Sequence, residues 1–124
     1  MAELQGRRIL VVEDEALVAM LLEDALMDAG CTILGPGSSV EQSLGILQHN
    51  RPDAAVIDLN LAGESSGPVA DALAAMGVPF LVATGYGAEG LPAGHEKVPV
   101  LTKPYDPSEL INLLAKLCEA QAAE

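Results

Sequence analysis

The chain consists of short apolar runs that alternate with longer segments of mixed polarity. Five runs rich in Val, Ile, Leu and Ala have the length of buried strands, at residues 9–12, 31–35, 54–58, 78–84 and 98–101. In the segments between most of them, apolar residues recur at the three- and four-residue spacing of one helix face. This alternation is typical of a parallel sheet covered by helices, so we expect an α/β fold with five parallel strands.

Start and stop signals bound the predicted helices. Gly30 stands at the expected C-terminal cap of the first helix. Ser39 and the serine before it each precede an acidic or amide residue by three positions, which places overlapping capping boxes before the second helix. Asp106 is followed by proline and precedes Glu109 by three residues, a favourable start for the last helix. The predicted helices cover residues 16–29, 40 to before Pro52, 67–76 and 107 onward.

Glycine and proline mark two segments that we do not expect to be helical. Four glycines and one proline lie between Thr84 and Val98, too many for a stable helix, so we expect a loop or a single short turn at the fourth crossover. Gly35-Pro36-Gly37 is typical of a turn and lacks the longer glycine fingerprint of a nucleotide-binding loop.

Size and charge restrict the classes of function. The chain has 124 residues, enough for one domain with its own core, and we expect residues 1–124 to form a single domain without an output domain. The formal net charge of −12 argues against direct binding to nucleic acid or to an anionic membrane. No apolar run is long enough for a signal peptide or a membrane span, so we expect a cytoplasmic protein.

The cysteines and histidines give no sign of a site. Cys31 and Cys118 match no metal-binding spacing and no CxxC pattern, so we expect reduced, partly buried thiols. Nothing in the pattern places His49 or His95 with other reactive residues, and we expect both to be exposed to solvent.

Polar residues with related chemistry stand at the ends of four apolar runs. They are Glu13 and Asp14 after the first run, Asp58 at the end of the third, Thr84 at the end of the fourth and Lys103 after the fifth. A parallel sheet collects the C-terminal ends of its strands at one edge, so we expect these side chains to converge on one crevice. Taken one at a time, each of these residues is common at the end of a strand. Their occurrence together in one chain favours a functional site.

These residue types suit phosphoryl chemistry on a carboxylate. Three carboxylates within a few ångströms repel by roughly 4 kcal/mol per close pair at an effective dielectric near 20, and a divalent cation removes that cost. Mg²⁺ fits well because it takes a few protein oxygens and keeps several waters. Asp58 would then attack phosphorus as a nucleophile, with the Thr84 hydroxyl and the Lys103 ammonium on the phosphoryl oxygens.

The same residues resemble the receiver domain of bacterial two-component response regulators, over residues 8–120. The matching positions are Glu13 and Asp14 for the acidic pair, Asp58 for the phospho-accepting aspartate, Thr84 for the Thr/Ser, and Lys103-Pro104 for the Lys-Pro step. The resemblance implies that Asp14, Asp58 and the backbone carbonyl of Asn60 ligate Mg²⁺, while Glu13 acts mostly through water. It also implies a doubly wound, flavodoxin/CheY-like sheet in strand order 2-1-3-4-5.

The resemblance further implies a phosphohistidine donor, carried by a sensor histidine kinase or a histidine phosphotransferase. Residues 79–87 resemble a receiver subgroup called FATGUY, in which a glycine-rich segment replaces the fourth helix, although Val82 stands where the subgroup has Phe. Members of this subgroup are often paired with kinases of the HWE and related types.

Three positions bear on the switch and on the lifetime of the phosphorylated state. Val100 stands where receivers usually have Phe or Tyr, and Ala62 stands where the loop after the phospho-aspartate often has Pro. Asn60 and Tyr86 match positions that flank the water attacking the acyl phosphate. For Tyr86 two interpretations stay open: it shields the phosphate or supplies the missing switch aromatic, or it has no special role.

Two other classes of protein stay open at this point. A haloacid-dehalogenase-like phosphatase also uses a strand-end aspartate with Mg²⁺, but it needs a second aspartate where this chain has Asn60. A phosphorylation-independent interaction module on the same fold need not keep the full set of site residues.

We expect a non-enzymatic, single-domain response regulator that accepts a phosphoryl group on Asp58 and acts by protein contact: as a relay, as a phosphate sink, or by presenting a changed surface to a partner. A monomer is favoured, because the helix that many receivers use for pairing is expected to be missing. We also expect Mg²⁺ and phosphorylation to order residues 85–97.

Overall fold

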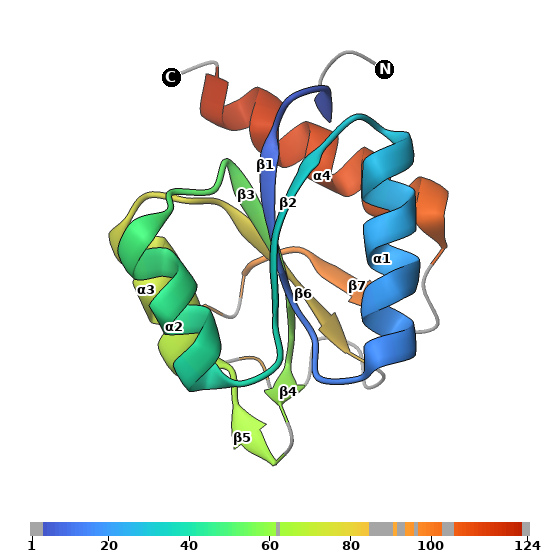
Figure 1. The fold of residues 1–124 in the computed structure, drawn as a ribbon. Helices are drawn as coiled ribbons and strands as arrows, with labels where there is room; N and C mark the ends of the chain where they lie inside the picture. Colours follow the sequence, from blue (N-terminus) through green and yellow to red (C-terminus); the bar gives the residue numbers. More distant parts are fainter. Residues whose placement is uncertain are drawn as a thin grey trace.

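The main sheet has five parallel strands in the order β2-β1-β3-β6-β7 (Figure 1). The computed structural model describes residues 4–61, 63–84, 91, 94, 95, 97–102 and 106–122. The strands are β1 (Arg8–Val12), β2 (Thr32–Gly37), β3 (Ala54–Asp58), β6 (Phe80–Thr84) and β7 (Val100–Thr102). Counted along the chain, this is the predicted order 2-1-3-4-5, and the expected doubly wound fold is confirmed.

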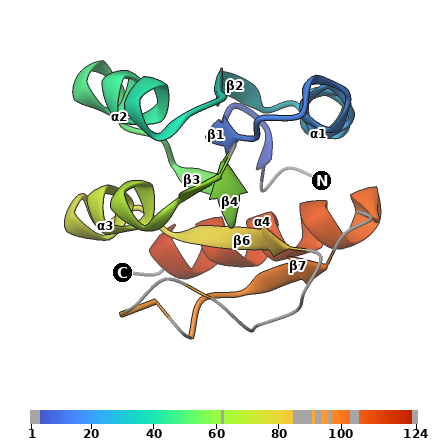
Figure 2. The ribbon, with the colours of Figure 1, turned by 90° about the horizontal axis from the view of Figure 1, so that it is seen from below.

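Two layers of helices cover the sheet, as Figure 2 shows. The helices are α1 (Ala16–Asp28), α2 (Val40–His49), α3 (Gly67–Ala75) and α4 (Pro107–Ala122). Along each strand, alternate residues face opposite layers. Val11 and Val56 lie in the core with α1 and α4, whereas Leu10 and Ile57 lie in the core with α2 and α3. Burial of both sheet faces explains why the strands read as continuous apolar runs.

The predicted helix ends have the expected capping contacts. Gly30 follows α1 with a φ of +86°, a conformation that glycine adopts without strain. The Ser39 hydroxyl accepts the Gln42 N–H at 3.0 Å at the start of α2, which confirms Ser39 as the cap, while Gln42 Oε1 accepts the Ser38 N–H at 2.8 Å. Asp106 Oδ1 accepts the Ser108 N–H at 3.0 Å at the start of α4. These contacts satisfy backbone donors that a helix leaves without an internal partner.

The structure corrects the expected turn at Gly35-Pro36-Gly37. These residues continue β2, which runs to Gly37 instead of ending at residue 35. The register against β1 shifts between Leu10 and Val12, so that one extra residue of β2 fits beside the same length of β1. Such a bulge bends the strand and re-aims its end.

A hairpin that the hydrophobic pattern did not predict follows β3. Its strands are β4 (Asn60–Leu61) and β5 (Glu64–Ser65), paired antiparallel, and Gly63 between them has a φ of +91°. The hairpin projects beyond the carboxyl ends of the main strands (Figure 1). It lies directly after the predicted phospho-acceptor in the chain.

The fourth crossover, between β6 and β7, has no helix at the positions that the structure describes, namely 91, 94, 95 and 97–99. This agrees with the predicted loss of a helix from this crossover. The expected ordering of residues 85–97 and the role of Tyr86 concern positions that lie mostly outside the described residues.

The expectation that His95 is exposed was wrong. Its side chain is only 12 % exposed, with Nε2 2.7 Å from Asp71 Oδ1. Its ring also meets the Phe80 ring edge-on, at 5.5 Å between centroids. These contacts tie the fourth crossover to α3 and to the start of β6. His49 is exposed, as expected.

Two further expectations concern thiols and membranes. Cys31 and Cys118 are free and buried, and both lie in the core between the sheet and helices α1 and α4. Within the described part of the chain, no helix has the length and apolar character needed to cross a membrane.

Candidate metal and phosphoryl site

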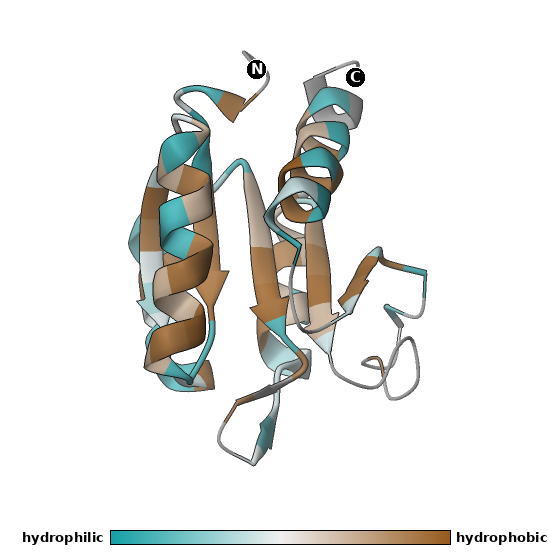
Figure 3. Cartoon of the chain, turned by 90° about the vertical axis from the view of Figure 1, so that its right-hand side faces the viewer, coloured by the Kyte–Doolittle hydropathy of each residue, from teal (hydrophilic) through white to brown (hydrophobic). Residues whose placement is uncertain are grey.

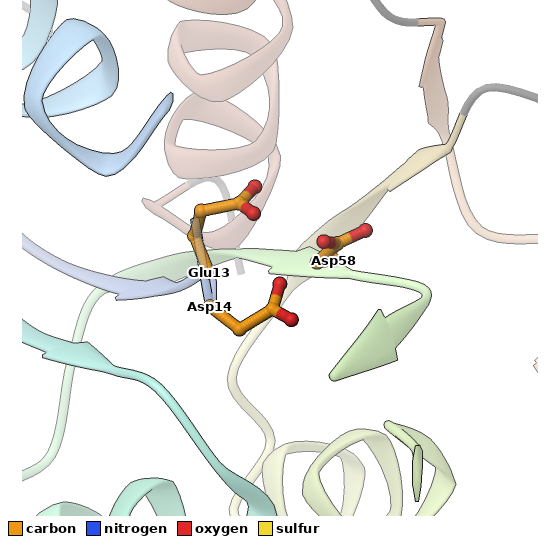
Figure 4. A group of neighbouring side chains, drawn as sticks. All are labelled: Glu13, Asp14 and Asp58. Carbon is orange, nitrogen blue, oxygen red and sulfur yellow. The ribbon is translucent and has the colours of Figure 1, made fainter. Parts of the chain in front are cut away.

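Three carboxylates meet at the carboxyl edge of the sheet. Glu13 and Asp14 directly follow β1, and Asp58 is the last residue of the neighbouring strand β3. Figure 4 shows the first two side chains extending from the end of β1 toward Asp58. One potential ligand oxygen from each residue lies within 4.8 Å of the other two. The structure therefore brings together the acidic residues that the strand-end pattern singled out.

The three carboxylates differ in exposure. Glu13 is 2 % exposed and Asp58 is 7 % exposed, whereas Asp14 is the most open of the three. Buried carboxylates lose hydration, and their mutual repulsion is screened less than at the surface. A cation at this position would relieve both costs.

Backbone contacts fix the start of this cluster. The Glu13 N–H donates to the Gly37 carbonyl at 3.0 Å, which ties the end of β1 to the end of β2. The Glu13 carboxylate accepts the N–H of Glu15 at 3.2 Å, just before α1 begins. A negative charge beside the N-terminal end of a helix is also favoured by the helix dipole.

The segment after Asp58 is held by Ser66, a residue that the strand-end pattern did not single out. The Ser66 hydroxyl and N–H both donate to the Leu59 carbonyl, at 3.1 and 3.2 Å, and Ser66 is fully buried. The Leu59 N–H donates to Ala83 of β6 at 3.0 Å. In the sequence, Ser66 is recognisable only as a serine directly before the Gly-Pro pair that opens α3. That pattern predicts a helix cap, not a hydrogen bond to the Leu59 carbonyl.

The remaining predicted site residues lie around the same edge or outside the described residues. Thr84 ends β6, the strand beside β3, and is 2 % exposed. Thr84 pairs with Thr102, the last residue of β7, so Lys103 follows a strand end adjacent to that of Thr84. Asn60 begins β4. Lys103 and Tyr86 themselves are not among the described residues.

The donor set fits a hard divalent cation. All three side chains offer oxygen ligands, and carboxylates at such separations suit Mg²⁺ or Ca²⁺ rather than metals that prefer thiolate or imidazole. Among the described residues this is the one group of three or more acidic, His or Cys side chains that could hold a metal.

The strand order and the acidic residues at the carboxyl edge define a receiver domain. The chain belongs to the response regulator receiver domain family, whose model matches residues 9–115. Receiver domains of this family are in general signalling modules of two-component systems rather than enzymes. The expected family is confirmed, whereas membership of the FATGUY subgroup stays a prediction.

Similar proteins include both solved structures and curated regulators. The solution structure of SdrG from Sphingomonas melonis Fr1 is 41 % identical, with a TM-score of 0.79, and the match covers 94 % of this chain and 98 % of that one. The BeF3-activated conformation of SdrG from Pseudomonas melonis Fr1 is 38 % identical, with a TM-score of 0.76 and coverage of 95 % and 99 %. The transcriptional regulatory protein PdtaR of Mycobacterium tuberculosis is 28 % identical over 111 residues, 85 % of this chain and 53 % of PdtaR. The chain thus spans about half the length of the curated relatives that it matches.

Proposed function

We propose that this receiver accepts a phosphoryl group on Asp58 in a Mg²⁺-dependent reaction. The observation that carries the proposal is the Asp58 carboxylate at the end of β3, in a cluster with Glu13 and Asp14 whose ligand atoms lie within 4.8 Å of one another. An oxygen of Asp58 attacks phosphorus, and the bond from phosphorus to the donor histidine nitrogen breaks. The electron pair of that bond stays on the imidazole, which takes up a proton.

The chain's own residues divide the remaining tasks. Asp14, Asp58 and the Asn60 carbonyl are proposed to hold Mg²⁺, with Glu13 acting through water. When bound, the ion neutralises the carboxylates and the charge of the incoming phosphoryl group. The Thr84 hydroxyl and the Lys103 ammonium then hold the phosphoryl oxygens, since hydrogen bonds from donors to anionic oxygens are strong.

The phosphorylated chain is proposed to act through protein contact. It would pass the phosphoryl group on, drain it from a kinase, or present a changed surface to a partner. The donor would be a sensor histidine kinase, of the HWE type if the subgroup resemblance holds, or a histidine phosphotransferase. The similar chain SdrG has a BeF3-activated conformation in solution, which supports an activation step of this kind here.

The surface beside the site suits a protein donor. Leu17, Met20 and Leu21 are each more than half exposed, in the first half of α1, a few residues after Asp14. Figure 3 shows this apolar end of α1 on the side of the strand carboxyl ends. A donor that covers these side chains gains from apolar burial, and the net charge of −12 favours a basic rim on that donor.

The proposal is tested by intact-mass spectrometry after incubation with Mg²⁺ and phosphoramidate, whose phosphorus–nitrogen bond resembles that of phosphohistidine. One phosphoryl adduct should form on the parent chain and on Asp24→Asn, an exposed α1 residue, and none on Asp58→Asn. Adducts that persist in Asp58→Asn, or form equally in EDTA, contradict the proposed reaction. A folded parent chain that neither takes an adduct nor binds Mg²⁺ supports the phosphorylation-independent module instead.

The docking surface has its own test. With a phosphorylated histidine kinase as donor, Leu21→Ser should slow transfer, while phosphorylation by phosphoramidate stays at the parent rate. Met27→Ser is the matched control, because Met27 is also an exposed apolar residue but lies at the far end of α1. Equal transfer rates for the two variants contradict docking on this surface.

A further inference from the structure

Gly37, the last residue of β2, touches both the acidic cluster and helix α2. Its carbonyl accepts the Glu13 N–H at 3.0 Å, directly behind the carboxylate that is the most buried of the three. Because of the bulge in β2, Gly37 pairs with Val12 in the sheet. The end of β2 therefore sets where the chain leaves β1 and enters the cluster.

On its other side, Gly37 lies against Ser43 with no room for a side chain. A Cβ built on Gly37 would stand 2.2 Å from Ser43 Oγ and 3.1 Å from both the α- and β-carbons of Ser43. Such a Cβ cannot be accommodated unless the strand end or the helix moves. The close approach to α2 is specific to Ser43, and a Cβ built on Gly45, two residues further along α2, meets no atom within 4 Å.

Ser43 is itself held in place. It is fully buried, and its hydroxyl donates to the Ser39 carbonyl at 2.7 Å. Ser39 in turn caps α2 by accepting the Gln42 N–H. Rotating the Ser43 hydroxyl away would break a buried hydrogen bond, and the Ser43 backbone would still stand 3.1 Å from the added carbon. The easier response to a side chain at position 37 is a shift of the β2 end, which carries the Gly37 carbonyl.

We propose that Gly37 and Ser43 are positioning residues for the metal site. The absence of a side chain on Gly37 lets β2 approach α2, and this approach places the Gly37 carbonyl where it holds the backbone of Glu13. The inference rests on the proposed function, because it concerns the carboxylates assigned there to Mg²⁺. Neither residue is assigned a contact with the metal or the phosphoryl group; both act through the backbone of Glu13.

The test compares Gly37→Ala with Gly45→Ala as matched control, using two readouts. Mg²⁺ affinity, measured by isothermal titration, should fall about tenfold or more in Gly37→Ala, as for other residues that support metal ligands. Hydrogen exchange of the Glu13 amide in metal-free protein should speed up by a similar factor, because its bond to the Gly37 carbonyl is lost. Gly45→Ala should keep the parent values in both measurements.

A compensating variant separates positioning from general loss of stability. Ser43→Gly removes the hydroxyl oxygen and the β-carbon that the built Cβ would meet. The loss of Mg²⁺ affinity caused by Gly37→Ala should therefore be smaller when Ser43→Gly is also present, with the double variant compared with Ser43→Gly alone. If Gly37→Ala does not fold, the same two readouts are measured on the double variant and compared with those of Ser43→Gly.

Two results overturn the inference. One is a folded Gly37→Ala chain with parent Mg²⁺ affinity and parent exchange at the Glu13 amide. The other is an equal loss of affinity with and without Ser43→Gly. Failure of the parent chain itself to bind Mg²⁺ contradicts the proposed function instead, and the Glu13 amide exchange then still decides whether the Gly37–Ser43 packing positions Glu13.

Discussion

Replacing Asp58 by Asn removes one of the three negative charges that the fold gathers at the carboxyl edge of the sheet. At a separation of 4.8 Å and an effective dielectric of about 20, each close pair of carboxylates repels by about 3.5 kcal/mol. Asp58 takes part in two such pairs, so the gross repulsion it adds is about 7 kcal/mol. Solvent around Asp14 and the cation expected from Lys103 offset most of this sum. We therefore expect the metal-free Asp58→Asn chain to be more stable than the parent by about 1–2 kcal/mol.

Urea denaturation in EDTA, followed by circular dichroism, measures this difference. Asp24→Asn is the control, because it removes one charge from the same total of −12 at an exposed α1 position. With Mg²⁺ at ten times its Kd the parent should gain about 1.4 kcal/mol, and Asp58→Asn, which lacks a ligand, should gain less. The advantage of the variant should therefore shrink or reverse when Mg²⁺ is added.

A specific result refutes this reasoning. If Asp58→Asn in EDTA is no more stable than Asp24→Asn, the carboxylates do not repel one another at the distances that the structure gives. The acidic cluster would then lack the stored repulsion that favours a cation, and the electrostatic argument for Mg²⁺ would fail.

The remaining predictions concern the scaffold and are read from urea denaturation. Ser39→Ala should lower the free energy of unfolding by about 1 kcal/mol, because the Ser39 hydroxyl caps α2; no change would contradict the cap. Leu81→Ala should cost about 2–5 kcal/mol, because Leu81 is fully buried in the central sheet, and a cost near that of an exposed site would contradict its placement. Burial, with a smaller contribution from the charge of Cys118, raises the pKa of the Cys31 thiol from 9.0 to about 11. The folded chain therefore keeps this thiol neutral at pH values where the unfolded chain loses the proton, and the resulting stabilisation, complete below pH 9, is lost as pH rises through 11. Between pH 9 and 11 the free energy of unfolding should fall more steeply in the parent than in Cys31→Ala. Equal slopes would show that this thiol is not what titrates.

The strand order and the acidic site could be predicted because both depend on local patterns. Each buried strand is a continuous apolar run, and a parallel sheet brings the residues after such runs to one edge. Glu13, Asp14 and Asp58 therefore met as expected. The helix ends could be predicted for a similar reason, because capping contacts join residues that are three or four positions apart in the sequence.

The features that were missed depend on contacts between distant segments. His95 is enclosed by Phe80 and Asp71, which no spacing along the chain connects with it. Gly35-Pro36-Gly37 has turn chemistry, but its course is set by the register against β1, and so it continues β2 as a bulged strand end. The β4–β5 hairpin has only two residues in each strand, too few for any periodicity to appear.

The central claim is that the Asp58 carboxylate itself receives the phosphoryl group, and reductive trapping tests it most directly. After incubation with Mg²⁺ and phosphoramidate, borohydride reduces an aspartyl phosphate to homoserine, which tandem mass spectrometry locates in the peptide that contains it. We predict homoserine at position 58, dependent on Mg²⁺ and on the phosphodonor. Homoserine at position 14, or a phosphoryl adduct that leaves Asp58 unreduced, would contradict the claim.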